Sequence, residues 1–266
     1  MSRLPLLVLA TAVLRALARD IPENVQDFYD ANIGGDCANP LSDAFTDGQT
    51  STANIVYCSD ASTGAVYLKG PDGTYDDMDI DCDGLNASEG LCNNDPSGQS
   101  QTAFQSEVQE FGIADLDAHV HPYVVLGNEG EDPSFDPQSA GIQPLSVVAV
   151  VCNGQLIYGV WGDTNGGTST GEASLALGQL CFGDDAVSGD NGHTEHDILY
   201  IAFPGDDAVP GSGADWTAAT KEDFESSIQE LGDSLVAGLG AEGQREVVGT
   251  KFESSQDEHS SNELES

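Results

Sequence analysis

The segment that most constrains the fold is an apolar stretch in the middle of the chain, residues 145–161, interrupted only by Asn153-Gly154. Its two arms, residues 145–152 and 155–161, are rich in β-branched side chains. Asn-Gly favours the two-residue turn that joins the arms of a β-hairpin. Because both arms are apolar nearly throughout, we expect the hairpin to be buried on both faces, at the centre of a barrel or sandwich.

Weaker patterns extend this prediction to the rest of the chain. Short apolar runs bounded by turn residues predict paired strands at residues 55–58 and 65–68, and another strand at 198–203. Helical spacing of apolar residues predicts three helices, one over residues 25–33, one between 101 and 112, and one from 220 to 238. The predicted fold is mainly β, with a compact β-barrel-like core, a few peripheral helices and disulfide staples.

The N-terminal residues have the pattern of a secretory signal peptide. A basic residue, Arg3, precedes an apolar run that ends near the small-residue motif around Ala18. The run is shorter than the roughly 20 residues that a membrane-spanning helix needs. We therefore expect a secreted, extracellular protein with a signal peptide at residues 1–18, one catalytic domain at 19–252 and a disordered acidic tail at 253–266.

Six cysteines follow the predicted cleavage site, at positions 37, 58, 82, 92, 152 and 181. An even number of cysteines in a secreted protein favours three disulfides, whereas zinc ligation would need paired short spacings that this sequence lacks. Six cysteines allow fifteen pairings, and the spacing does not choose among them. The sequon at Asn86 makes one surface glycan possible.

The charge of the chain is strongly negative, with 46 acidic residues against 7 basic ones and a formal net charge of −39. Such a surface repels nucleic acids and anionic membranes and attracts cationic partners. The same composition also serves solubility alone. Charge therefore excludes nucleic-acid and membrane partners and permits a cationic ligand, and we expect a monomer that needs no cofactor.

Two acids flank a glycine-rich loop after the second arm of the predicted hairpin. Asp163 ends the buried strand, and Glu172 begins the next ordered segment. Glycoside hydrolysis needs two such carboxyls, one to protonate the leaving oxygen and one as base or nucleophile. Trp161 lies on the same side of the strand as Asp163, so it is a candidate for an apolar wall or a sugar-stacking surface.

Three segments together resemble the fungal endo-chitosanases, glycoside hydrolase family 75. They read LIYGVWGDTNG with GEAS at residues 156–166 and 171–174, DIDCDG at 79–84, and DAHVHPYVV at 117–125. The resemblance implies a small β-barrel core and an endo-acting hydrolase of chitosan, a cationic polysaccharide of β-1,4-linked glucosamine. It implies that Asp163 and Glu172 are the essential acids and that hydrolysis inverts the anomeric centre. We assign Glu172 as general acid and Asp163 as base.

The acids and histidines of the matching segments are the candidates for substrate binding. We expect Asp81, Asp83, Asp117 and His119 to contact the sugar chain, together with Trp161. Carboxylates can bind the ammonium groups of glucosamine directly.

Two alternative functions come from other classes. Residues 79–84 begin like a D-x-D-x-D-G calcium loop, but the bidentate Glu expected at position 12 is Gly90. His119 and His121 alternate along an apparent strand, as a metal pair would, although no third ligand is evident. A secreted calcium-binding protein and a non-catalytic module that binds a cationic polysaccharide therefore stay open. We expect His193 and His196 to be surface loop residues, and we expect no metal site.

Overall fold

The computed structural model describes residues 19–240. The eight strands are β1 (Val56–Ser59), β2 (Val66–Lys69), β3 (Asp76–Asp81), β4 (Tyr123–Asn128), β5 (Val147–Cys152), β6 (Gln155–Asn165), β7 (Glu172–Ser174) and β8 (His193–Ala202). The α-helices are α1 (Glu23–Ile33), α2 (Gln105–Gln109), α3 (Leu175–Phe182) and α4 (Lys221–Val236). Four single 3₁₀ turns lie at Gly90–Cys92, Pro137–Ala140, Asp206–Ala208 and Gly211–Gly213.

The strands form one sheet whose pairings close on themselves. Their order is β1-β2-β8-β3-β7-β4-β6-β5, and β5 also pairs with β8. Six strands therefore complete a ring, and β1 and β2 extend it from β8. The β3–β7 and β4–β6 pairs are parallel, and the others are antiparallel. The predicted mainly-β fold with a compact core and peripheral helices is confirmed.

The predicted hairpin is the centre of this sheet. β5 and β6 pair from Cys152 opposite Gln155 to Val147 opposite Val160, and every residue of β5 is buried. Asn153 and Gly154 have φ of 47° and 71°, the two positive values that the predicted turn requires. β6 pairs on its other edge with β4, and β5 with β8, so neither arm is an edge strand. The side chains on both faces of β5, and of β6 from Gln155 to Asp163, are buried.

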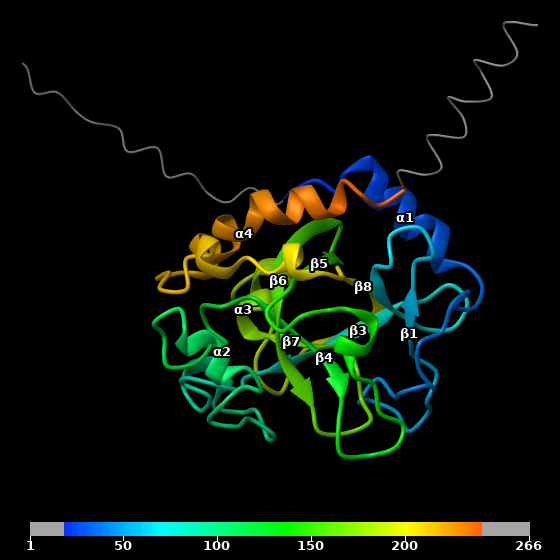
Figure 1. The fold of residues 1–266 in the computed structure, drawn as a ribbon. Helices are drawn as coiled ribbons and strands as arrows, with labels where there is room; N and C mark the ends of the chain where they lie inside the picture. The colour runs from blue at the N-terminus through cyan, green and yellow to red at the C-terminus, as the bar shows by residue number, and fades with distance from the viewer. Residues whose placement is uncertain (1–18, 241–266) are drawn as a thin grey trace, which may run out of the picture.

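Helices cover the outside of the sheet. Figure 1 shows α4 and α1 along one side of the strands and α2 on the flank. Thr220 caps α4 by accepting a hydrogen bond from Asp223 N. α4 contacts β5 and β6, and Gly232 permits a close approach, because a Cβ there would lie 2.6 Å from the ring of Tyr158.

The structure differs from the sequence patterns in three places. The acidic segment that begins the calcium-like motif forms the buried strand β3, so only its last residues are in a loop. His119 and His121 lie in a turn and not on a strand, because β4 starts only at Tyr123. His193 and His196 lie on β8, which begins five residues before the predicted strand. At β3 and at the start of β8, pairing across the sheet overrides a polar local sequence.

All six cysteines are paired, as Cys37–Cys58, Cys82–Cys92 and Cys152–Cys181. Three disulfides fit a protein of an oxidising, extracellular environment. The predicted signal peptide at residues 1–18 and the predicted tail at 253–266 lie outside the described residues. Among residues 19–240, no helix combines the length and apolar character needed to span a membrane.

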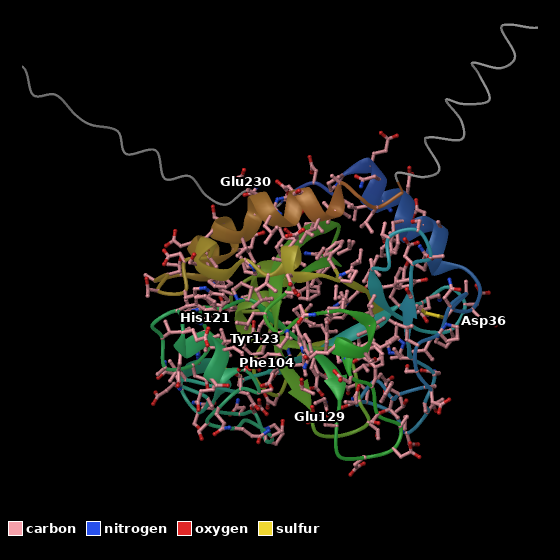
Figure 2. All side chains as sticks on the ribbon, viewed as in Figure 1. Asp36, Phe104, His121, Tyr123, Glu129 and Glu230 are labelled. Atoms are coloured by element: carbon pink, nitrogen blue, oxygen red, sulfur yellow. A yellow bond between two sulfur atoms is a disulfide. The ribbon has the colours of Figure 1, made fainter. Side chains whose placement is uncertain are left out.

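Acidic side chains are spread over the surface of the described chain. Figure 2 shows Asp36, Glu129 and Glu230 projecting outward at well-separated points, whereas Tyr123 lies inside. Tyr123 is fully buried, and the three acids are exposed. The negative charge therefore surrounds the molecule and is not confined to one face.

Candidate active site

Four neighbouring strands bring the acidic segments together. In the order β3-β7-β4-β6, Asp79 of β3 lies opposite Glu172 of β7, and Val125 of β4 lies opposite Asp163 of β6. β7 and β6 both pair with β4. The two acids that the sequence places on either side of a loop are therefore carried by strands that flank one common neighbour.

A cavity of about 400 Å³ opens where these strands end. Its wall includes Asp81, Asp83, Asp163 and Glu172, four of the predicted site residues, together with the loop from Thr164 to Gly167. We call this space the first cavity. The structure thus brings both predicted catalytic acids and two predicted substrate-binding acids to one surface.

Asp163 is held firmly by the backbone. Its side chain is almost fully buried, and Oδ1 accepts hydrogen bonds from Ala103 N at 2.9 Å and Thr164 N at 2.7 Å. Oδ2 has no hydrogen-bond partner among the described residues. Burial is the largest cause of a pKa of about 7 at Asp163; the two backbone donors lower this pKa, and the charges of Asp83 and Asp115 raise it.

Glu172 is held by side chains of its own loop. Its Oε1 accepts hydrogen bonds from Asn165 Nδ2 at 2.6 Å and Ser169 Oγ at 3.0 Å. Burial, helped by the nearby charges of Asp79 and Asp163, raises the pKa of Glu172 to about 7, although the bonds from Ser169 and Asn165 lower it. Because ionised Asp163 disfavours a second charge on Glu172, the two groups are suited to holding one proton between them.

Asp81 and Asp83 complete an acidic cluster with Asp163. One oxygen of each carboxyl lies within 4.8 Å of the others. The pKa of Asp81 lies well above its usual value. Burial is the largest cause, and the charges of Asp163, Asp83 and Glu172 also raise this pKa. The hydroxyl of Tyr123 donates to the backbone oxygens of Asp81 and Asp83 and so fixes this segment. Three carboxylates could ligate a hard cation such as Ca²⁺ or bind an ammonium group of a ligand.

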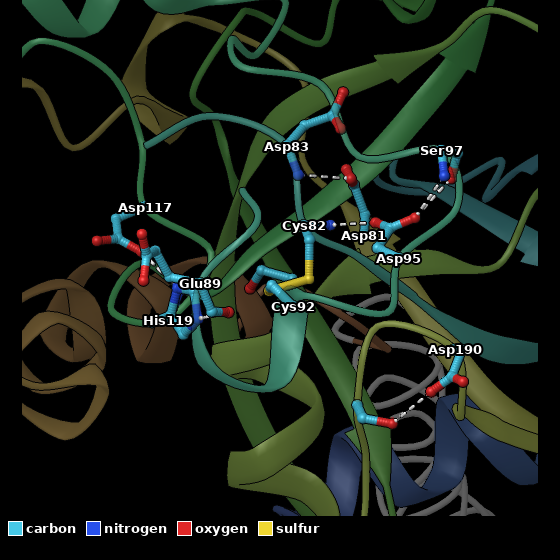
Figure 3. The surroundings of a disulfide bond; sticks show 12 residues. Asp81, Cys82, Asp83, Glu89, Cys92, Asp95, Ser97, Asp117, His119 and Asp190 are labelled. Carbon is cyan, nitrogen blue, oxygen red and sulfur yellow. Dashed lines mark hydrogen bonds and ion pairs between the residues drawn. A yellow bond between two sulfur atoms is a disulfide. The ribbon is translucent and has the colours of Figure 1, made fainter. Parts of the chain in front are cut away.

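The structure does not bring the other three predicted substrate-binding residues to the first cavity. Asp117 pairs with His119 Nδ1 at 2.9 Å, and Figure 3 shows these two on the opposite side of the Cys82–Cys92 disulfide from Asp81. Trp161 is 2 % exposed, donates to the Asp163 carbonyl oxygen and packs edge-on against Phe104. It therefore serves as an apolar floor beneath Asp163 and offers no face for stacking a sugar.

Sequence reasoning missed the residues that position the predicted acids. Asn165 and Ser169 hold Glu172, and Gln49, from a distant loop, donates to Asp79 Oδ1 at 2.6 Å. Asn165 and Ser169 lie between the two acids in the sequence, and this position could have indicated their contact with Glu172. Nothing local to Gln49 indicates its contact with β3.

A second pair of acids lies near the site but inside the protein. Asp76 and Asp77 are 0 % exposed, and neither lines the first cavity. Burial raises the pKa of Asp76 to about 7 and that of Asp77 to about 9, where the charge of Asp76 adds to the effect. Their oxygens approach Gly171, whose φ is 82°, so closely that a Cβ there would lie 2.5 Å from Asp77 Oδ1.

The comparison with known families decides what kind of protein carries this geometry. The family described as fungal chitosanase of glycosyl hydrolase group 75 matches residues 78–238, which include all five acids that line the first cavity. The chain belongs to this family. The resemblance inferred from three short segments is confirmed, and this group 75 chain is a glycoside hydrolase.

Relatives of this group 75 enzyme match along nearly their whole length. It is 52% identical over 238 residues to endo-chitosanase B of Aspergillus oryzae, covering 88% of this chain and 98% of the relative. It is also 52% identical over 240 residues to an endo-chitosanase of Aspergillus fumigatus, covering 90% and 100%. A more distant relative, endo-chitosanase C of Aspergillus oryzae, is 35% identical over 197 residues, covering 72% of this chain and 46% of the relative.

Proposed function

We propose that this enzyme is a secreted, monomeric endo-chitosanase that hydrolyses β-1,4-linked glucosamine polymers by acid–base catalysis between Glu172 and Asp163. The observation that carries the proposal is that both carboxyls line one cavity and each has a pKa raised to about 7. A general acid and a base near neutral pH need such values. The relatives named as endo-chitosanases supply the substrate class.

Glu172 acts as the general acid. In its protonated form it donates its proton to the glycosidic oxygen as the bond from that oxygen to the anomeric carbon breaks. The free electron pair stays on the leaving oxygen, which becomes the hydroxyl of the departing sugar. Hydrogen bonds from Asn165 and Ser169 to Oε1 hold the carboxyl in place, so Oε2 is the oxygen that carries the proton.

Asp163 acts as the base. Its carboxylate accepts a proton from a water molecule whose oxygen attacks the anomeric carbon on the face opposite the leaving group, with inversion. The backbone N–H groups of Ala103 and Thr164 stabilise its ionised form. After one turnover Asp163 is protonated and Glu172 ionised, and exchange with solvent restores the starting state.

Asp81 and Asp83 bind the substrate in this proposal. They share the wall of the first cavity with the catalytic pair, and in their ionised form they suit the protonated amines of chitosan. The three disulfides support secretion.

The test is release of reducing ends from soluble chitosan by the purified enzyme, with chitin as a control and with a chelator in a parallel reaction. We expect hydrolysis of chitosan that is insensitive to chelator and much slower release from chitin. Binding without release would instead indicate a non-catalytic polysaccharide-binding module. Loss of activity with chelator, restored by Ca²⁺, would place a cation at the cluster of Asp81, Asp83 and Asp163 and contradict a metal-free mechanism.

A further inference from the structure

A second cavity adjoins the first one. Its volume is about 340 Å³. Asp79, Asp81, Ser97 and Glu172 line both cavities, whereas Asp163 lines only the first. The two spaces therefore form one continuous cleft with Glu172 at their boundary and the proposed base on one side only.

The outer wall of the second cavity carries two further carboxyls, on loops that hold each other in place. Asp95 accepts hydrogen bonds from Cys82 N at 3.1 Å and from Ser97 N at 2.8 Å, so its orientation is fixed beside the Cys82–Cys92 disulfide. Gly189 N donates to Leu91 O at 2.8 Å, and a Cβ on Gly189 would lie 2.8 Å from Asp95 N. The loop before β8 is thus packed against the disulfide-bonded loop.

Asp190 follows directly after this contact. It is exposed, and its Oδ1 accepts a hydrogen bond from Ser188 Oγ at 2.9 Å. Figure 3 shows Asp190 below Asp95, on the same side of the disulfide as Asp81. Its carboxylate therefore stands at the open side of the second cavity, on a loop whose backbone is anchored.

The positions of acid and base determine the direction of the sugar chain. Water activated by Asp163 attacks the anomeric carbon of one sugar, so that sugar occupies the first cavity. Glu172 protonates the oxygen that joins this sugar to the next one, and Glu172 lies where the cavities meet. The sugar on the leaving-group side must then occupy the second cavity.

We propose that the second cavity is the subsite for the leaving-group sugar and that Asp190 selects a glucosamine with a free amine there over an N-acetylated one. The inference rests on the proposed function. An ammonium group gains a charge–charge contact with the carboxylate, and an N-acetyl group, which is neutral and bulkier, gains none. Asp79 and Asp81 line the inner part of the same space and add to its negative charge.

The test uses partially acetylated chitosan, whose fragments record both sides of the cleaved bond. Each newly formed non-reducing end is the sugar that occupied the second cavity, and each new reducing end is the sugar that was attacked in the first. In Asp190→Asn, we expect the acetylated fraction of new non-reducing ends to rise about two- to fivefold, the range for one exposed ion pair, while the acetylated fraction of reducing ends stays unchanged.

Asp215→Asn is the matched control. Asp215 is also exposed, its Oδ1 also accepts from a hydroxyl two residues away, Thr217 Oγ1 at 2.9 Å, and it lines neither cavity. Both kinds of end should keep the wild-type composition in this variant. Equal thermal midpoints of the two variants and the wild type would show that all three are folded.

Each other outcome overturns a defined part of the account. If Asp190→Asn leaves the non-reducing ends unchanged while the wild type is active, the amine-selecting role is wrong. If only the reducing ends change, the chain runs in the opposite direction and Asp163 and Glu172 have exchanged roles. If the wild type does not cleave chitosan, the proposed function fails, and this inference fails with it.

Discussion

The carboxyl pair Asp163 and Glu172 lines the first cavity, whereas the pair Asp76 and Asp77 is enclosed by the protein. Burial raises the pKa of all four groups, to about 7 for Asp163, Glu172 and Asp76 and to about 9 for Asp77. A raised pKa therefore marks both pairs equally. What separates them is access, because only the first pair can meet a substrate.

The contacts of the two pairs also differ. Asp163 and Glu172 each accept two hydrogen bonds on one oxygen. Asp76 Oδ2 and both side-chain oxygens of Asp77 have no donor within the described part of the chain. The first pair is arranged to change its ionisation during a reaction. Asp76 and Asp77 destabilise the folded protein least while they are protonated, so their effect on the free energy of unfolding depends on pH.

The largest expected effect is on catalysis by the cavity pair. Asp163→Asn and Glu172→Gln keep shape and volume but remove proton exchange, and each should lower kcat on chitosan by about 10²- to 10⁴-fold. Because both groups act in one displacement, the double variant should be little slower than the slower single variant. Steady-state kinetics on soluble chitosan measure this.

Substitution of Asp81 or Asp83 by Asn is the control within the same cavity. If these acids bind amines, the substitution should chiefly raise KM. Either catalytic variant that retains more than about a tenth of the wild-type kcat would refute the assignment of the pair.

The enclosed pair should affect stability and not catalysis. The pKa values of Asp76 and Asp77 in the folded protein exceed the roughly 3.9 of an unfolded chain, so the folded state binds more protons between these values. The contribution of these two groups to stability is then fully present at and below about pH 4. It is lost as pH rises through about 7 and 9. Asp77→Asn should add about 1 to 3 kcal/mol to the free energy of unfolding at pH 8, and little at pH 4.

Denaturant unfolding at the two pH values measures this difference. Asp43→Asn, at an exposed position, removes the same charge and should change neither value. Asp77→Asn should keep kcat within about threefold of wild type. A loss of kcat comparable to that of Asp163→Asn, in a folded variant, would remove the distinction between the pairs.

The smallest expected effect comes from the surrounding negative charge. Raising salt from about 0.1 M to about 1 M shortens the screening length from roughly 10 to 3 Å, so the attraction of the cationic polymer weakens. We expect kcat/KM to fall severalfold and kcat to change little. For more highly acetylated chitosan, which has fewer amines, kcat/KM should fall less. A kcat/KM independent of salt for both polymers would contradict electrostatic capture.

The sequence was most informative where structure is local. The β5–β6 hairpin, α1 and α4 follow from patterns within a few turns of chain, and the structure has each of them. β3 was not predicted, because four aspartates in six residues are unusual in a strand, and only pairing with β7 and β8 makes a strand of them.

The site residues show the same difference between local signals and long-range packing. Asp163 and Glu172 were recognised from one loop and its resemblance to a family, and the structure places both on the first cavity. Of the two roles considered for Trp161, its burial fits the apolar wall; the sequence could not choose between them, because alternation along a strand indicates a side and not a depth. The second pair, Asp76 and Asp77, gave no usable signal, because enclosure is set by the packing of distant segments.

The most direct test of this account is to observe which carboxyls respond to the substrate. In the Glu172→Gln enzyme, carbon NMR titration of the aspartate carboxyls can be performed with and without a glucosamine hexamer. A bound ammonium group stabilises a nearby carboxylate, so the pKa values of Asp81 and Asp163 should fall on binding while those of Asp76 and Asp77 stay the same. A shift confined to Asp76 and Asp77, or no shift at Asp81 and Asp163 with bound hexamer, would contradict the claim that access distinguishes the two pairs.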